Sequence, residues 1–185
     1  MTDSEYVPDF GRSVLDGSKR IPVHIPVCYA GEPGYRDNTD CDTPVFIMVY
    51  PSGRHIPATD LEWAIVWRLD VAAQSWRVIR ASREMHPVRI SEPLPFLTNA
   101  GPLSYSISPH AASRARKARI GLLSGRQRGN LENIARSHPV RYPGGGWNGQ
   151  TFVAEILQEA VQRGILDAEQ VTRALQEAGE RWDTN

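Results

Sequence analysis

The segment that most restricts the fold is a glycine-rich turn leading directly into an amphipathic helix, YPGGGWNGQTFVAEIL at residues 142–157. From Phe152 to Val161, apolar residues recur at i, i+1, i+4, i+5, i+8 and i+9, which predicts a helix with one apolar stripe over residues 151–163. Gly164 suits the position just past the helix end. Because such a stripe must pack against another element, the rest of the chain has to supply a surface for it.

Apolar segments earlier in the chain predict that this surface is a sheet. PVFIMVY at residues 44–50 is a continuous apolar run, typical of a buried strand. Residues 61–71 and 75–82 are rich in Trp, Val and Ile and predict an antiparallel hairpin whose Trp67 and Trp76 lie in the core. Alternation divides the first of these strands into two faces. One face holds Leu61, Trp63, Ile65, Trp67 and Leu69, and the other holds Glu62, Ala64, Val66 and Arg68.

The remaining segments predict short strands, loops and helices. Residues 87–109 are proline-rich and predict a loop with one short strand at LSYSIS, and KARIGLLSG predicts another strand. GNLENIARSH predicts a helix that Asn130 caps and that stops before Pro139. A last helix begins after Asp167, with Gln170 completing a capping pattern. The fold class is therefore α+β, with an antiparallel sheet of about four to six strands packed against C-terminal helices.

The domain organisation follows from length and composition. Residues 1–18 are polar and patternless and predict a mobile arm, whereas residues 19–185 predict a single domain. RIPVHIPVCYA at residues 20–30 predicts an edge strand or an extended segment wrapped over the domain, because its prolines cannot donate to a ladder. The first 43 residues could close a pocket or pair with a second subunit, so a homodimer is one alternative.

Charge and cysteine content exclude several classes of protein. Net charge is zero, there are two cysteines, and no segment has the length of a membrane span or the pattern of a secretion signal, so we expect a cytoplasmic protein without membrane contact.

Residues 110–141 carry eight Arg or Lys against one acid. No aromatic residues interleave with these arginines, which favours a solvated basic face over a nucleic-acid site. A nucleic-acid module would use Arg114, Arg116, Lys117, Arg119, Arg126 and Arg128 on one exposed face.

The turn before the predicted helix has the form of a site for an anion or a nucleophile. Unpaired N–H groups at a helix start attract anions and stabilise a developing oxyanion or thiolate. GGGW is neither a P-loop nor a dinucleotide fingerprint, and no other cofactor motif is present, so we expect no cofactor. The five histidines are scattered without metal-ligand spacing, so we expect no metal site.

A resemblance to a known group of proteins is carried by four segments in order, VFIMVYPSG, LEWAIV, IGLLSGRQRGNLENIARSHPV and WNGQTFVAEIL. They resemble a group of uncharacterised fungal domains in which a His-Trp strand precedes a Trp-Asn-Cys helix start. Those domains are in turn similar to the circularly permuted papain-like proteins that include relatives of lecithin:retinol acyltransferase. The resemblance covers residues 44–166, about two thirds of the chain, and implies a permuted papain-like fold in which a His activates a Cys for acyl transfer or hydrolysis.

The chain departs from this pattern at both chemical positions. Glu62 stands where the resemblance expects the His, and Gly149 stands where it expects the Cys. A glycine has no side chain to form a covalent intermediate, so Cys-dependent hydrolysis is excluded if the correspondence is right. Glu62 could instead be the catalytic residue, since a carboxylate among tryptophans would be desolvated and suited to proton transfer near neutral pH. The alternative is that Glu62 lies on the solvent face of its strand.

Several residues near the turn are candidate ligand contacts. Asn148 and Gln150 could hold a ligand carbonyl or cap the helix. Tyr142 and Trp147 could be pocket walls or loop anchors, and Trp63 is a further candidate for ligand contact.

The first functional hypothesis is a cofactor-independent enzyme, a cyclase, isomerase or lyase, acting on a small organic molecule. Analogy with the fungal domains places it in specialised metabolism. The second is a non-catalytic descendant that binds a small molecule or a protein, and the third is the nucleic-acid module.

Overall fold

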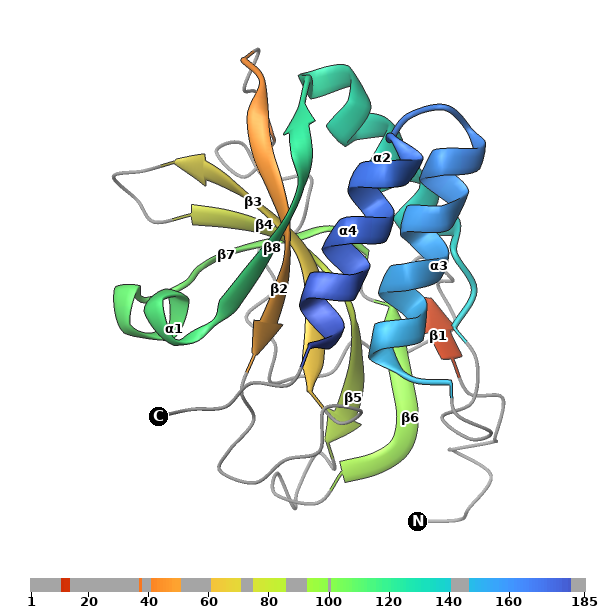
Figure 1. Cartoon of the computed structure of the whole chain (residues 1–185). Helices are drawn as coiled ribbons and strands as arrows, with labels where there is room; N and C mark the ends of the chain where they lie inside the picture. Colours follow the sequence, from red (N-terminus) through yellow and green to blue (C-terminus); the bar gives the residue numbers. More distant parts are fainter. Residues whose placement is uncertain are drawn as a thin grey trace.

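The chain has an α+β fold with C-terminal helices, as the sequence predicts, but it contains two sheets where one was expected (Figure 1). The computed structural model describes residues 11–13, 37, 41–50, 61–70, 75–85, 93–99, 101–140 and 147–180. The larger sheet is antiparallel with strand order β7-β4-β3-β2-β8, and the smaller has order β1-β6-β5. The strands are β1 Gly11–Ser13, β2 Thr43–Tyr50, β3 Glu62–Asp70, β4 Ser75–Ile79, β5 Ala81–Met85, β6 Pro93–Asn99, β7 Leu103–Ser106 and β8 Arg116–Leu123. The helices are α1 Pro109–Arg114, α2 Gly125–Ser137, α3 Gly149–Gln162 and α4 Ala168–Gly179.

The main hydrophobic core lies between the larger sheet and the three C-terminal helices. Helices α3 and α4 lie side by side over this face of the sheet (Figure 1), and α3 packs against β3 and α2. Trp63 and Trp67 from β3 join Phe152 and Val153 from α3 in one buried cluster. Burying such large apolar side chains contributes about 2 to 3 kcal/mol each relative to leaving them exposed, so this interface holds the helices in place.

The opposite face of the larger sheet carries a second, smaller core. Ala64 and Val66 of β3 pack there with Trp76 and Val78 of β4. The alternation expected along β3 is therefore confirmed, because neighbouring residues join different clusters. The core positions predicted for Trp67 and Trp76 are also confirmed.

Two predictions about the strands were wrong. Residues 75–82 form not one strand but β4 and the start of β5, which belong to different sheets and are separated at Arg80. Residues 87–109 contain strand β6 and the start of helix α1 as well as the expected β7. Among the described residues, β1 pairs with Leu97–Asn99, so Pro93 and Pro95 lie in a part of β6 that pairs with β5 alone, an edge position where proline is tolerated.

The N-terminal segment is described at a few positions only. Gly11–Ser13, inside the predicted arm, form β1 and pair in parallel with β6. The edge strand predicted at residues 20–30 lies outside the described residues. The pocket-closing or subunit-pairing role expected of the first 43 residues therefore stays a prediction.

The caps of the C-terminal helices explain where each helix starts. The Asn130 cap predicted for α2 was wrong, because Ser124 accepts a hydrogen bond from the Gln127 amide and the Gln127 side chain accepts one from the Ser124 amide. The predicted end before Pro139 is confirmed. Asp167 caps α4 as predicted, through the Gln170 amide. Gly164 follows α3 with a φ of 67°, the left-handed conformation that favours glycine.

Candidate functional site

The start of α3 is held against the sheet by its own polar side chains. Asn148 caps the helix, with Oδ1 accepting from the amides of Gln150 at 2.9 Å and Thr151 at 3.1 Å. The Gln150 side chain donates to the Leu61 carbonyl at 2.9 Å, just before β3. A Cβ at Gly149 would lie 3.2 Å from the backbone carbonyl of Ala81, at the start of β5. In the structure, Asn148 therefore serves as a cap and Gln150 as a tether.

Glu62 lies on the side of the larger sheet away from α3. It shares the face of Ala64 and Val66, whereas α3 packs on the face of Trp63. Its carboxylate is 51% exposed and lies 3.1 Å from Nη1 of Arg80. The structure therefore does not bring the Glu62 side chain and Gly149 to one face. The desolvated surroundings expected of an acid–base carboxylate are not found at Glu62, and the solvent-face alternative describes its position.

The aromatic candidates have different surroundings. Trp63 is buried in the main core, and its indole Nε1 makes no hydrogen bond among the described residues. Trp147 is also buried; its ring meets the edge of Phe152 and its Nε1 donates to Oε2 of Glu155 at 3.2 Å. Tyr142 lies outside the described residues. Of the candidates named from sequence, Trp147 is the one whose side chain contacts a cluster of titratable groups.

That cluster consists of His138, Glu155 and Glu159, and we call it the His138 cluster. Nε2 of His138 lies 3.0 Å from Oε2 of Glu155, and Nδ1 lies 3.3 Å from Oε2 of Glu159. The imidazole side chain is 10% exposed, and its ring packs edge-on against Phe152 with centroids 5.5 Å apart. Both ring nitrogens thus face carboxylates, and only a protonated imidazole can donate to both of them.

Three elements position these groups. His138 is the C-cap of α2, and its carbonyl accepts a hydrogen bond from the Asn99 side chain at the end of β6. Glu155 and Glu159 are one turn apart on α3, where two like charges destabilise a helix unless a cation lies between them. Arg163, just past the end of α3, forms an ion pair with the other oxygen of Glu159. Glu159 therefore has one partner on each side.

A solvent-open hollow of about 380 Å³ lies beside the His138 cluster. Its lining residues are all polar or charged, and their side chains can both donate and accept hydrogen bonds. The lining residues are His138, Glu155, Gln158, Glu159, Gln162 and Arg163. Titratable side chains beside a hollow are the usual starting point for a binding-site hypothesis.

Sequence reasoning did not identify the His138 cluster. The available signal is the spacing of Glu155 and Glu159, which places two carboxylates on the polar side of a predicted helix. What the sequence does not reveal is that the end of α2 packs beside α3 and inserts an imidazole between them. The local motif HPV at His138 occurs also at His86 and carries no such information.

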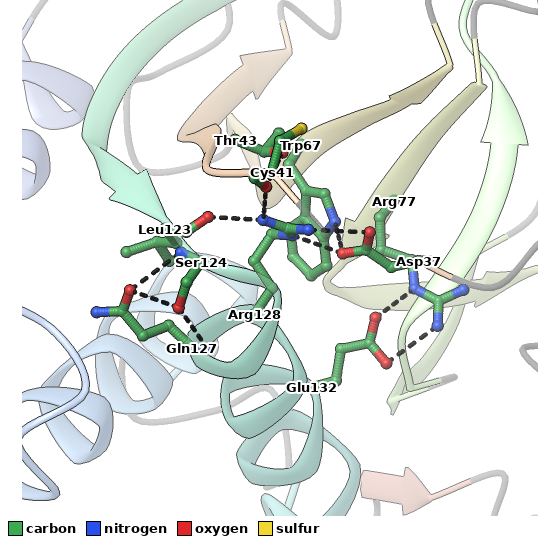
Figure 2. Close-up of polar contacts among 10 residues, drawn as sticks. All are labelled: Asp37, Cys41, Thr43, Trp67, Arg77, Leu123, Ser124, Gln127, Arg128 and Glu132. Carbon is green, nitrogen blue, oxygen red and sulfur yellow. Dashed lines mark hydrogen bonds and ion pairs between the residues drawn. The ribbon is translucent and has the colours of Figure 1, made fainter. Parts of the chain in front are cut away.

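The basic segment does not form a single exposed face. Arg128 is completely buried, and its guanidinium holds both carboxylate oxygens of Asp37, at 2.6 and 3.1 Å (Figure 2). It also donates to the carbonyl oxygens of Cys41 and Leu123. Trp67 Nε1 donates to the same Asp37 carboxylate at 2.9 Å. The arrangement that the nucleic-acid hypothesis requires is therefore absent, because one of its six cations lies in the interior.

A second buried arginine lies near the first. Arg77 of β4 is 2% exposed and donates to both carboxylate oxygens of Glu132 on α2, at 2.7 and 3.0 Å (Figure 2). It also donates to Oγ of Ser104 at 2.7 Å. We call Arg77, Arg128, Asp37 and Glu132 the buried arginine cluster. It joins α2 to the larger sheet and to the N-terminal segment at Asp37.

The described part of the chain contains no group of three or more His, Cys, Asp or Glu residues able to hold a metal ion. None of its helices has both the length and the apolar composition needed to cross a bilayer.

Comparisons with known proteins add no relative. No protein-family model, curated protein or solved structure matched the chain significantly. The resemblance to the fungal and permuted papain-like domains therefore stays a prediction.

Proposed function

We propose that this protein is a non-catalytic descendant of a permuted papain-like thiol enzyme and that it binds a small molecule in the hollow beside the His138 cluster. The observation that carries the proposal is the hollow itself, where an imidazole and two partly exposed carboxylates adjoin two glutamines. Gly149 removes the nucleophile that the resemblance expects. A helix start tethered to the beginning of β3 supports the permuted papain-like plan.

Binding is favoured over proton transfer by the way the titratable groups are paired. Each ring nitrogen of His138 already faces a carboxylate, so neither is open to a substrate without a rearrangement. The hollow is also open to solvent, whereas catalysis by charged groups gains most in a site that excludes water.

The charges of the hollow indicate the chemistry of its ligand. Glu155 and Glu159 place two carboxylates beside the hollow, and Arg163 pairs with Glu159. A ligand with an amidinium or ammonium group can donate hydrogen bonds to a carboxylate of this kind.

Benzamidine is a suitable probe because it is a planar cation, and benzoate is a control of the same shape and opposite charge. In an NMR titration at about pH 8, above the range in which histidines usually titrate, we expect benzamidine to shift the Trp147 indole and the amides of α3. Glu159→Gln should weaken binding roughly fivefold, which corresponds to about 1 kcal/mol. Glu169→Gln is the matched control, because Glu169 is an exposed glutamate of α4 that forms an ion pair with Arg173 one turn further along that helix.

Two results would overturn the binding proposal. One is the absence of benzamidine binding in the wild-type protein. The other is binding that benzoate reproduces or that Glu155→Gln and Glu159→Gln leave unchanged.

A second candidate is the cofactor-independent acid–base enzyme, a cyclase, isomerase or lyase of a small organic molecule. The observation that favours it is the pair His138 and Glu155, in which a carboxylate held by Trp147 orients an imidazole. In this candidate, His138→Gln abolishes turnover of a candidate substrate whereas Glu62→Gln preserves it. Turnover by His138→Gln that matches the wild-type rate would exclude His138 from the mechanism.

A further inference from the structure

We propose that protonation of His138 controls access to the hollow, with the Glu159 side chain as the moving part. The charged form of the imidazole holds Glu155 and Glu159 together, and the neutral form releases Glu159. The inference that this motion regulates ligand binding rests on the function proposed above, whereas the motion itself does not.

The number of protons on the His138 imidazole decides how many carboxylates it can donate to. Nε2 and Nδ1 of His138 lie 3.0 and 3.3 Å from oxygens of Glu155 and Glu159. A neutral imidazole has one N–H and can donate to only one of these carboxylates. Histidine is the side chain whose charge ordinarily changes between about pH 5 and pH 8.

When the imidazole is neutral, Glu155 is the carboxylate that keeps its hydrogen bond. Glu155 makes the shorter contact with the ring, is the less exposed of the two, and also accepts from Trp147. The remaining proton therefore stays on Nε2, and the lone pair of Nδ1 then faces an oxygen of Glu159. Two acceptors in contact repel, so Glu159 moves away from the ring.

Glu159 then moves toward Arg163. Its other oxygen already lies against Arg163, whose side chain is 56% exposed just past the end of α3. A rotation toward Arg163 keeps one ion pair and leaves solvent, rather than protein, beside Nδ1. The hollow then widens at the ring and gains an exposed acceptor.

Other groups around His138 do not supply a competing charge within the described residues. In the last turn of α2, Arg136 is paired with Glu132. Asn99 of β6 is neutral and contacts the His138 backbone rather than its ring. Trp147 and Phe152 contribute uncharged rings. Among the described residues, the charged side chains nearest the ring are therefore Glu155, Glu159 and, through Glu159, Arg163.

The sign of the effect follows from these contacts. While the two carboxylates are ionised, both contacts to His138 are present at low pH, and the contact to Glu159 is lost as pH rises through the titration of the imidazole. Ligand cations and protons thus compete, so cation binding strengthens as pH rises.

An NMR pH titration without any ligand tests the motion. We expect the His138 ring and the Glu159 side-chain carboxyl to follow one midpoint. In Glu159→Gln, the amide can donate to the neutral Nδ1, so residue 159 should no longer move away as the ring loses its proton. Glu169→Gln should behave as wild type. A Glu159 signal that stays constant while His138 titrates would overturn the switch.

Benzamidine titrations at about pH 6 and about pH 8, on either side of the usual histidine range, then test the regulation. Wild type should bind several-fold more tightly at the higher pH, and His138→Gln should bind equally at both. A wild-type affinity that does not change with pH overturns the regulation. If the NMR motion is present but benzamidine binds at neither pH, the switch is supported and the proposed function fails.

Discussion

Helix α2 makes ion pairs at both of its ends, and the two sets differ in burial and in the type of cation. Near its N-terminus, Arg128 is fully buried and holds Asp37 through two hydrogen bonds. At its C-terminal cap, His138 meets two carboxylates that are 22% and 30% exposed. Arginine keeps its charge at any physiological pH, whereas histidine can lose it. The buried arginine cluster therefore fixes α2, and the His138 cluster is the end whose contacts can change.

This difference also separates stability from function. Breaking one partner of a buried ion pair leaves an uncompensated charge in the interior, whereas an exposed pair contributes little. We expect substitutions in the buried arginine cluster to lower the stability of the fold, and substitutions in the His138 cluster to alter binding in a protein of nearly unchanged stability.

The largest predicted effect is that of Arg128→Met. Loss of the guanidinium leaves the Asp37 carboxylate without its buried cation, which should lower the free energy of unfolding by about 3 to 5 kcal/mol. Urea denaturation measures this change. Arg126→Met is the matched control, because Arg126 is exposed on the same helix and should cost less than about 0.5 kcal/mol.

A double variant tests the reason for that loss. Arg128→Met combined with Asp37→Leu removes the stranded charge and should recover part of the stability. If the double variant is as unstable as the sum of the single variants, lost packing rather than the uncompensated charge explains the effect.

The elements that could be predicted from sequence are those whose signal is local. The apolar stripe of α3, the alternation along β3 and the cap at Asp167 each depend on residues within a few turns or pleats, and all three are present in the structure. The split between β4 and β5 was missed because no glycine, proline or other turn residue marks the change of sheet at Arg80.

The buried arginine cluster and the His138 cluster were harder to predict because their contacts join separate parts of the chain. Arg128 and Asp37 are 91 residues apart, and Arg77 and Glu132 are 55 apart. No local pattern distinguishes Arg128 from the exposed arginines near it, so its burial could not be inferred. The placement of His138 between Glu155 and Glu159 likewise depends on how α2 and α3 pack together.

Glycine substitutions on the two helices provide a prediction of intermediate size. A Cβ at Gly149 would lie 3.2 Å from the backbone oxygen of Ala81, which cannot move as a flexible side chain would. We expect Gly149→Ala to destabilise the protein by about 1 to 2 kcal/mol and to shift the start of α3. Gly149→Cys should meet the same obstacle, so restoring a thiol also has a structural cost.

Gly129, on the exposed side of α2, is the matched position. A Cβ there meets no atom within 4 Å, so Gly129→Ala should stabilise the helix by about 0.5 to 1 kcal/mol. Thermal unfolding of the two variants should thus move in opposite directions. A destabilised Gly129→Ala variant would show that α2 is constrained at its middle as well as at its ends.

The smallest predicted effect is that of Glu62→Gln, and it bears on the comparison because Glu62 also forms an ion pair. Its partner Arg80 is 26% exposed and its own carboxylate 51%, so the pair resembles neither the buried arginine cluster nor the hollow. We expect less than about 0.5 kcal/mol change in unfolding free energy. Benzamidine affinity should also be unchanged, in contrast to Glu159→Gln. A Glu62→Gln variant that folds normally but loses binding or turnover would instead restore Glu62 as the functional carboxylate and would place the site on the opposite face of the sheet from α3.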